Sequence, residues 1–255
     1  SIVPLEVRLD DELYEDNVTI TPEEFYKKIN SGMKPSTSQP SVGKILEVYE
    51  NLKAQGFERI VVFTVTSKLS GTYSSFTQAS ELIEGIDIKI IDTLQVARIV
   101  GCAVEKIIKD FSNGNLAYEN IEDECHKLLK QQNILVTIEN MDFLYAGGRL
   151  TKTQFLLSNF LNILPIITIK DGILDVSGKH RGMSKALTKI CEEIKEKDPK
   201  SLIILYTTDD LLKKAQDVVA KTFGNIETEA IIISPVIGTH AGPRAVGIGY
   251  LEYEK

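Results

Sequence analysis

The sequence contains no tryptophan, and it holds only three cysteines and three histidines among its 255 residues. Cys102, Cys125 and Cys191 are widely separated and odd in number, which argues against a disulfide framework or a cysteine zinc site. No dense cluster of acidic, cysteine or histidine residues indicates a metal ion. We therefore expect a cytoplasmic protein in a reducing compartment, without a metal or a cofactor.

Positive charge and long apolar runs are also scarce. Lysine and arginine number 29 against 36 acidic residues, for a formal net charge of -7. This balance argues against a nucleic-acid-binding surface, which needs clustered basic residues. No apolar run approaches the roughly 20 residues of a membrane-spanning helix, and the first residues do not resemble a signal peptide. Hydrophobic residues nevertheless make up 43% of the chain, enough for a sizeable core.

The most informative stretch is the turn Ser67–Tyr73, which follows an apolar run over 60–65 typical of a buried strand. The residues after Tyr73 are typical of a helix. Ser70, Gly71 and Thr72 are therefore expected at the carboxyl end of a strand and the start of a helix, where free amides favour an anion. The alternative is an ordinary serine cap that binds nothing. No Walker or Gly-x-Gly-x-x-Gly sequence is present, so nucleotide binding has little support.

Strands alternate with helices as far as about residue 150, which predicts an α/β fold with a mostly parallel sheet. The pattern then changes. Two apolar runs, 164–170 and 173–177, flank Asp171–Gly172, a pair typical of a tight hairpin. We predict an α/β domain over residues 1–150 and an α+β domain over residues 151–255.

Four further segments carry local predictions. Thr21–Pro22, followed by two glutamates, predicts a helix start. Residues 10–17 are expected to form an acidic loop, and residues 33–40 a stiff loop in which Ser36, Thr37 and Ser38 lie between two prolines. Residues 238–244 are expected to form a glycine-rich turn before the last strand.

Two candidate side chains have both a functional and a structural interpretation. Gly147–Gly148–Arg149 could hold an anion, although a glycine turn with a solvent-facing arginine is the more common case. His240 could act as a catalyst or could be a hydrogen-bonded structural residue. A hydrolase built on Ser70 and His240 would lack the Gly-x-Ser-x-Gly sequence of a nucleophile elbow. His126, on a polar helical segment, is expected to face solvent.

Taken together, these motifs resemble the DegV family, whose characterised members are bacterial fatty-acid-binding proteins. The resemblance covers essentially the whole chain, because six short motifs occur in the order and spacing of that family. These motifs are Thr37–Ser41, Leu69–Tyr73, Ile91–Thr93, Ala146–Arg149, the segment with Lys179 and Arg181, and Gly238–Pro243.

The resemblance implies a two-domain protein with a three-layer parallel-sheet domain, an α+β domain and a buried long-chain fatty acid such as palmitate. It places the fatty-acid carboxylate on Thr37 and Ser70, with His240 and Arg181 nearby. It also implies a carrier without catalysis of its own, which delivers the acid to a separate kinase for acyl-phosphate formation and phospholipid synthesis. Transient membrane contact would allow ligand exchange. Supporting roles are expected for Ser38, Gly71, Thr72, Thr239 and Gly242.

Elementary energetics agrees with a carrier. Burial contributes roughly 0.8 kcal/mol per methylene, so a tail of about 16 carbons is worth on the order of 10 kcal/mol before the costs of binding. Candidate residues for the wall around the tail could equally belong to an ordinary core. They are Phe155, Leu156, Leu157, Phe160, Leu161, Ile163 and Ile166.

The sequence departs from the family pattern in three places. A first strand that ends in an Asp-Ser pair is absent, Leu164 stands where lysine is common, and Arg244 stands where glycine is common. These departures could alter head-group geometry, kinase docking or chain preference. Two other functions also stay open: a hydrolase or transferase that uses Ser70 or His240, and an interaction module with a closed core.

Overall fold

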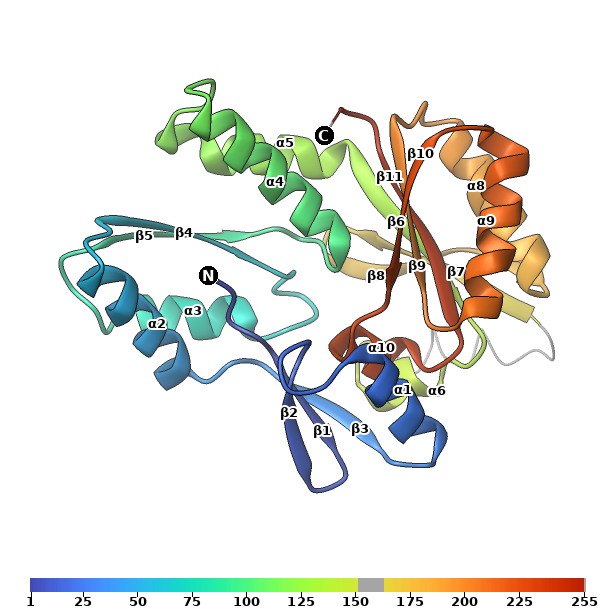
Figure 1. Cartoon of the computed structure of the whole chain (residues 1–255), viewed down its shortest axis with the longest axis horizontal. Coiled ribbons are helices and arrows are strands. Elements are labelled where there is room, and N and C mark those ends of the chain that lie inside the picture. Colours follow the sequence, from blue (N-terminus) through green and yellow to red (C-terminus); the bar gives the residue numbers. More distant parts are fainter. Residues whose placement is uncertain (151–162, 255) are drawn as a thin grey trace.

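The computed structural model describes residues 1–150 and 163–254, and its architecture is the predicted α/β fold (Figure 1). No helix in those two ranges is both long enough and apolar enough to cross a membrane. The strands are β1 (Glu6–Leu9), β2 (Glu12–Glu15), β3 (Pro35–Ser38), β4 (Arg59–Thr64), β5 (Asp87–Asp92), β6 (Gln132–Ile138), β7 (Ile163–Lys170), β8 (Ile173–Arg181), β9 (Ser201–Tyr206), β10 (Glu227–Ile232) and β11 (Ala245–Leu251).

Within the described ranges, the helices lie around three separate sheets. They are α1 (Pro22–Asn30), α2 (Val42–Ala54), α3 (Thr72–Ser80), α4 (Arg98–Ser112), the single 3-10 turn η1 (Tyr118–Asn120), α5 (Ile121–Lys130), α6 (Asp142–Ala146), α8 (Met183–Lys195), α9 (Asp209–Phe223) and α10 (Pro235–Ala241).

The largest sheet has six strands in the order β10-β9-β11-β6-β7-β8. The pair β10–β9 is parallel, and the other neighbouring pairs are antiparallel, so this sheet is mixed rather than mostly parallel as predicted. Helices α8 and α9 cover one face of this sheet (Figure 1), where Leu187 and Ile190 pack against Ile204 and Ile248. The other face turns toward the rest of the chain. Because β6 and β7 pair across residue 150, one sheet joins both predicted domains, and the division into domains stays a prediction.

A second unit has the expected three layers. Strands β4 and β5 pair in parallel, with α2 and α3 on one side and α4 and α5 on the other (Figure 1). Ile60 and Ile88 pack toward Tyr49 of α2 and Phe76 of α3. Val61 and Ile91, on the alternate face, join the core that includes α4 and α5. This alternation follows from the period of two along a strand.

A third sheet, β2-β1-β3, is antiparallel and was not predicted. The acidic segment 10–17 contains β2, and the hydroxyl segment 33–40 contains β3, so both loop predictions were wrong. Both strands are polar and four residues long, and each pairs with one edge of β1. Both strands form because they are hydrogen-bonded to β1. Neither has the alternation of apolar and polar residues from which a strand is predicted, so the sequence did not indicate them.

The predicted glycine-rich turn at 238–244 is also corrected, because residues 235–241 form helix α10. Pro235 occupies its first turn, and Gly238 lies against the ring of Tyr26, where an added Cβ would come within 2.5 Å of the tyrosine oxygen. Glycine is present here to allow close packing rather than a turn. Gly242, at φ +77°, then ends the helix.

Two local predictions are confirmed. Thr21 caps α1: its hydroxyl accepts a hydrogen bond from the Glu24 amide while the Glu24 carboxylate accepts one from the Thr21 amide. Asp171 and Gly172 join β7 to β8 with φ angles of 51° and 82°. Both residues are thus in the left-handed region that a two-residue hairpin of this kind requires.

Candidate functional site

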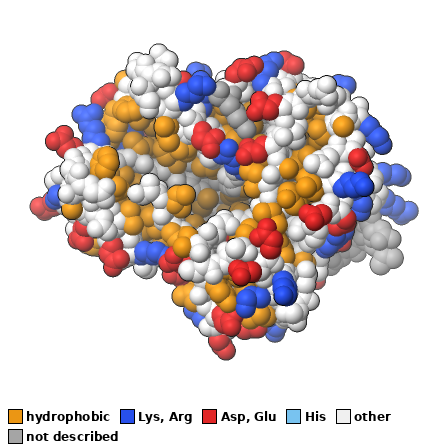
Figure 2. Space-filling model, viewed as in Figure 1, with side chains coloured by type: hydrophobic (Ala, Val, Ile, Leu, Met, Phe, Trp, Pro, Cys, Tyr) orange, Lys and Arg blue, Asp and Glu red, His pale blue; other side chains and the backbone are white. Residues whose placement is uncertain are grey.

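A cavity of about 460 Å³ lies between the six-stranded sheet, the end of β3, the turn before α3, and α10. Figure 2 shows a hollow on this face of the molecule, with hydrophobic side chains inside it. The volume lies within the range of small-molecule sites. An interaction module with a closed core is therefore not what the chain forms.

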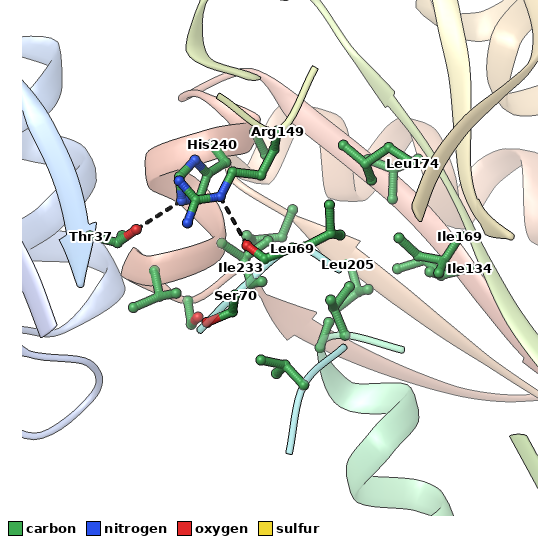
Figure 3. Close-up of a pocket in the computed structure, with 18 of the residues that line it drawn as sticks. Thr37, Leu69, Ser70, Ile134, Arg149, Ile169, Leu174, Leu205, Ile233 and His240 are labelled. Atoms are coloured by element: carbon green, nitrogen blue, oxygen red, sulfur yellow. Dashed lines mark hydrogen bonds between the residues drawn. The ribbon is translucent and has the colours of Figure 1, made fainter. Parts of the chain in front are cut away.

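The larger part of the cavity wall is aliphatic, and it comes from the sheet face that α8 and α9 leave uncovered. Figure 3 shows several of these side chains on one side of the cavity. The aliphatic residues from the sheet are Ile134, Val136 and Ile138 of β6, Ile167 and Ile169 of β7, Leu174 of β8, Leu205 of β9, and Ile231 and Ile232 of β10.

Polar side chains gather at the other side, where β3 meets α10. Thr37 Oγ1 and His240 Nε2 are 2.9 Å apart, although the two residues are 203 positions apart in the chain. Both line the cavity (Figure 3). Thr37 occupies an inward-facing position of β3, and Ser36 beside it is exposed.

Helix α10 is held against the first 40 residues by its own amino end. The Asp16 carboxylate accepts a hydrogen bond from the Val236 amide at 3.0 Å, and the Tyr26 hydroxyl donates to the Ile233 carbonyl at 3.0 Å. Burial raises the pKa of the Asp16 carboxyl. These contacts fix the helix that carries His240 relative to the strand that carries Thr37.

Ser70 approaches the same end of the cavity from the turn before α3. Its hydroxyl lies 2.8 Å from Thr72 Oγ1 and accepts a hydrogen bond from the Thr72 amide at 3.3 Å. Gly71 is the helix cap and has no side chain to cap with, so the turn is not an ordinary serine cap. A Cβ on Gly71 would lie 2.5 Å from Gln39 Oε1, so glycine lets the segment after β3 pack on this turn.

Arg149 completes the polar end, although a solvent-facing arginine was the more common of its two interpretations. Its Nε donates to the Leu69 carbonyl at 3.0 Å (Figure 3), and its NH1 donates to the Gly147 carbonyl. The guanidinium is therefore turned into the cavity lining rather than toward solvent. A Cβ on Gly147 would lie 2.2 Å from His240 Nδ1, so glycine there lets the imidazole fit. The Gly147–Gly148 pair was the sequence signal for this arrangement.

Electrostatics keeps His240 neutral. Burial, together with the positive charge of Arg149, lowers the pKa of His240 from 6.5 to about 4. Its Nδ1 is buried and has no hydrogen-bond partner within the described part of the chain. A neutral ring with its proton on Nε2 donates to Thr37 Oγ1, which leaves the threonine hydroxyl hydrogen free to point at a ligand.

Of three residues predicted to support the site, Ser38, Thr239 and Gly242, only Ser38 lines the cavity. Ser38 lines the cavity, and its hydroxyl donates to Glu6 at 2.8 Å. Thr239 is buried and donates to the Pro235 carbonyl inside α10 at 2.9 Å. Gly242 lies against the ring of Phe143, 2.6 Å from where its Cβ would be. Thr239 and Gly242 therefore support α10 and do not line the cavity.

Arg181 is the predicted residue that the structure does not bring to the others. It is exposed at the end of β8, paired in register with Ile163, and is not among the described residues that line the cavity. Its expected role beside the carboxylate stays a prediction. Arg149 is the arginine that lies next to His240.

The predicted wall residues fall into two groups. Phe155, Leu156, Leu157, Phe160 and Leu161 lie outside the described residues. Ile166 is fully buried, but on the sheet face covered by α8 and α9, and Leu164 packs there too. Ile163 is half-buried and does not line the cavity. Ile167 and Ile169 point to the opposite face of the sheet, as the alternation along a strand requires, and line the cavity instead.

Neither Ser70 nor His240 is arranged as part of a catalytic pair. A nucleophile and its base need to share a hydrogen bond. Ser70 is bonded to Thr72, and His240 Nε2 is bonded to Thr37. The remaining nitrogen of His240 has no orienting carboxylate among the described residues.

The prediction that His126 faces solvent was wrong. The side chain is part-buried, and its Nε2 lies 3.0 Å from the Asp92 carbonyl.

Comparison with known proteins gives a match over nearly the whole chain. A family model described as "Uncharacterised protein, DegV family" matches residues 1–253. A DegV domain-containing protein of Caldanaerobacter subterraneus subsp. tengcongensis is 32% identical over 258 residues, which cover 98% of this chain and 91% of that protein.

Solved structures agree with this match. The structure of a stearic-acid-binding protein from Eubacterium ventriosum has a TM-score of 0.86 and 26% identity, covering 98% of this chain and 90% of the other. The Fatty Acid Kinase (Fak) B3 protein of Streptococcus pneumoniae, loaded with linoleic acid, has a TM-score of 0.83 over the same shares of the two chains. It is 20% identical, so its similarity concerns the fold.

Proposed function

Because this chain belongs to the DegV family, we propose that it binds one long-chain fatty acid in the cavity described above. The observation that carries the proposal is the distribution of polarity: an aliphatic wall on one side, and Thr37, Ser70, Arg149 and His240 together at the other. The tail lies along the sheet, and the carboxylate lies at the polar end. Relatives described as fatty-acid-binding support this assignment.

The tail supplies the affinity. A chain of about 16 carbons, fully buried, contributes on the order of 10 kcal/mol before the costs of association. The aliphatic side chains of β6, β7, β9 and β10 provide the surface for that burial. Because the tail supplies most of the binding free energy, the contacts to the carboxylate need only orient it.

Thr37 and Ser70 hold the carboxylate in this proposal. Each has a hydroxyl at the cavity surface, and hydrogen bonds to a charged group are stronger than those between neutral groups. His240 orients Thr37 through the 2.9 Å contact, and Arg149 supplies a positive charge nearby. A bound anion would raise the pKa of His240 again, because it offsets the arginine's charge.

We further propose that the protein is a cytoplasmic carrier that presents the carboxylate to a separate kinase. The expectation comes from the family resemblance. The chain has no nucleotide-binding sequence motif, so any phosphoryl transfer to the carboxylate needs another protein. Transient contact with a membrane would serve to exchange the fatty acid.

A double variant, Thr37→Ala with Ser70→Ala, tests the head-group site. Two hydrogen bonds to a carboxylate are worth a few kcal/mol together, so the dissociation constant for stearic acid is expected to rise at least tenfold. Titration of delipidated protein with a fluorescent fatty acid and competing stearic acid measures it.

The matched control is Ser36→Ala with Ser74→Ala, which removes exposed hydroxyls from β3 and α3. The control is expected to bind like the wild type. Equal affinity in the two double variants would show that Thr37 and Ser70 do not hold the carboxylate. A folded wild type with no affinity for fatty acids would contradict the proposed function as a whole.

A further inference from the structure

A second arginine lines the cavity, far from the polar end. Arg98 is the first residue of α4, and its side chain forms part of the cavity wall while only 22% of it is exposed. The segment before it is strained, since Leu94 and Ala97 have φ angles of 52° and 62°. Val96 and Ala97 also line the cavity. Strained backbone of this kind is typically kept at ligand clamps.

The Arg98 guanidinium joins two elements. Its Nε lies 3.3 Å from both carboxylate oxygens of Glu229 on β10, and its NH1 and NH2 donate to Glu105 of α4 at 2.7 and 2.9 Å. A Cβ on Gly101 would lie 2.8 Å from NH1, so glycine gives the guanidinium room to lie along α4. The Arg98–Glu229 bond therefore connects the α4 unit to an edge strand of the large sheet.

Sheet register places this bond along the cavity. Glu229 pairs with Ile203, Ile203 with Gly249, and Gly249 with Ile134, so the four residues form one row across the sheet. The polar end lies near the Ile138 row, because Ile138 pairs with Ala245, which follows α10 closely. Ile138 is four positions along the strand from Ile134, a distance of about 13 Å.

Figure 3 agrees with the position of the Ile134 row, because Ile134 lies on the side of the cavity opposite Thr37. An extended chain advances about 1.2 Å per bond, as the peptide backbone does, so a straight acyl chain of about 11 bonds covers the 13 Å. Longer tails must reach Arg98 or bend.

We propose that Arg98, held in place by Glu229 of the edge strand β10, closes the tail end of the cavity and sets the length of acyl chain that the protein retains. This inference rests on the proposed function. The aliphatic stem of Arg98 forms the end wall, and the bond to Glu229 keeps that wall in place. The buried stem with a charged head at the surface is a common arrangement for arginine.

Arg98→Ala tests the end wall. Removing the stem lengthens the cavity, so tails that previously met the wall can bury further methylenes, each worth about fourfold in affinity. Dissociation constants for saturated acids from lauric to behenic acid are measured on delipidated protein. The affinity ratio of arachidic to myristic acid is expected to rise at least tenfold over that of the wild type.

Glu229→Gln tests the bond between Arg98 and β10 separately from the wall. It removes the charge that holds Arg98 to β10 and keeps the bond to Glu105. Release of a bound fluorescent fatty acid into excess lipid vesicles is expected to accelerate at least threefold relative to Glu105→Gln, which keeps the bond to Glu229. Salt should accelerate release from the wild type, since it screens a partly exposed pair, and should have less effect on Glu229→Gln.

The matched control is Lys106→Ala, which removes the 3.1 Å ion pair between Lys106 and Asp110 of α4. Neither residue lines the cavity. The control should keep the wild-type chain-length profile and release rate. An unchanged profile in folded Arg98→Ala would overturn the inference and leave fatty-acid binding intact. If Arg98→Ala does not fold, the release rate of Glu229→Gln tests the inference instead, and release no faster than from Glu105→Gln would overturn it. A wild type that binds no fatty acid would overturn both proposals.

Discussion

At the residue scale, the pairing of a neutral histidine with a nearby arginine defines the polar end of the cavity. Burial and Arg149 together lower the pKa of His240 to about 4. The histidine therefore carries no charge at neutral pH, and its Nε2 lies 2.9 Å from Thr37 Oγ1. In the proposed site, His240 orients Thr37 and Arg149 supplies the positive charge that the carboxylate meets.

This pKa predicts how stability depends on pH. Above pH 6.5 His240 is neutral in the folded and unfolded states and contributes nothing to the dependence. Between pH 6.5 and 4 only the unfolded chain takes up the proton, so stability falls as the pH falls. At pH 5 this group alone should cost about 2 kcal/mol of unfolding free energy.

Urea denaturation of delipidated wild type and His240→Gln, at pH 8 and pH 5, measures that contribution. The variant lacks the titrating ring, so the stability difference between the two proteins should shift by about 2 kcal/mol toward the variant at pH 5. A difference that is the same at both pH values would mean that His240 has an ordinary pKa in the folded protein.

How far the site could be predicted also differs from residue to residue. Thr37, Ser70 and His240 were predicted by motif, and the structure brings all three to one cavity. Arg149 was discounted, because no sequence pattern shows that a guanidinium folds back onto the Leu69 carbonyl. Arg181 was expected beside the carboxylate and lies exposed at the end of β8, since its strand is fixed by pairing along β7.

At the element scale, α10 depends on contacts from both ends. Asp16 and Tyr26 hold its amino end, and Arg244 holds the turn that follows its carboxyl end. Arg244 donates to both carboxylate oxygens of Asp210, at 2.7 and 3.0 Å, and to Glu139 at 3.2 Å. These hydrogen bonds lower the pKa of the Asp210 carboxyl. Arg244 does not line the described cavity.

Arg244→Gly is therefore expected to affect stability more than binding. The ion pairs are partly exposed, so their loss should lower the unfolding free energy by about 1 kcal/mol. Fatty-acid affinity should stay within twofold of the wild type. Thermal unfolding and ligand titration measure the two effects, with Lys189→Ala, which removes an exposed pair with Glu192, as the control. A tenfold loss of affinity without a loss of stability would place Arg244 in the site.

Elements with strong local signals were predicted, and elements that depend on distant partners were not. The α1 cap and the Asp171–Gly172 hairpin are encoded by adjacent residues. Strand β3 exists because β1 pairs with it, and α10 forms although it contains Gly238, because that glycine packs on Tyr26. Neither partner is visible in the local sequence.

At the scale of the whole molecule, the cavity lies where three units meet. The β2-β1-β3 sheet supplies Thr37, the turn before α3 supplies Ser70, and α10 with the six-stranded sheet supplies His240 and the aliphatic wall. No single unit forms the cavity. Ligand binding should therefore stabilise the units against separation, because the ligand contacts all of them.

The most direct test of fatty-acid binding is native mass spectrometry of the purified protein, followed by solvent extraction and identification of what is released. We predict one long-chain fatty acid per chain, with delipidated protein taking up one equivalent of added stearic acid. A folded protein that carries no fatty acid and takes up none would contradict the central claim.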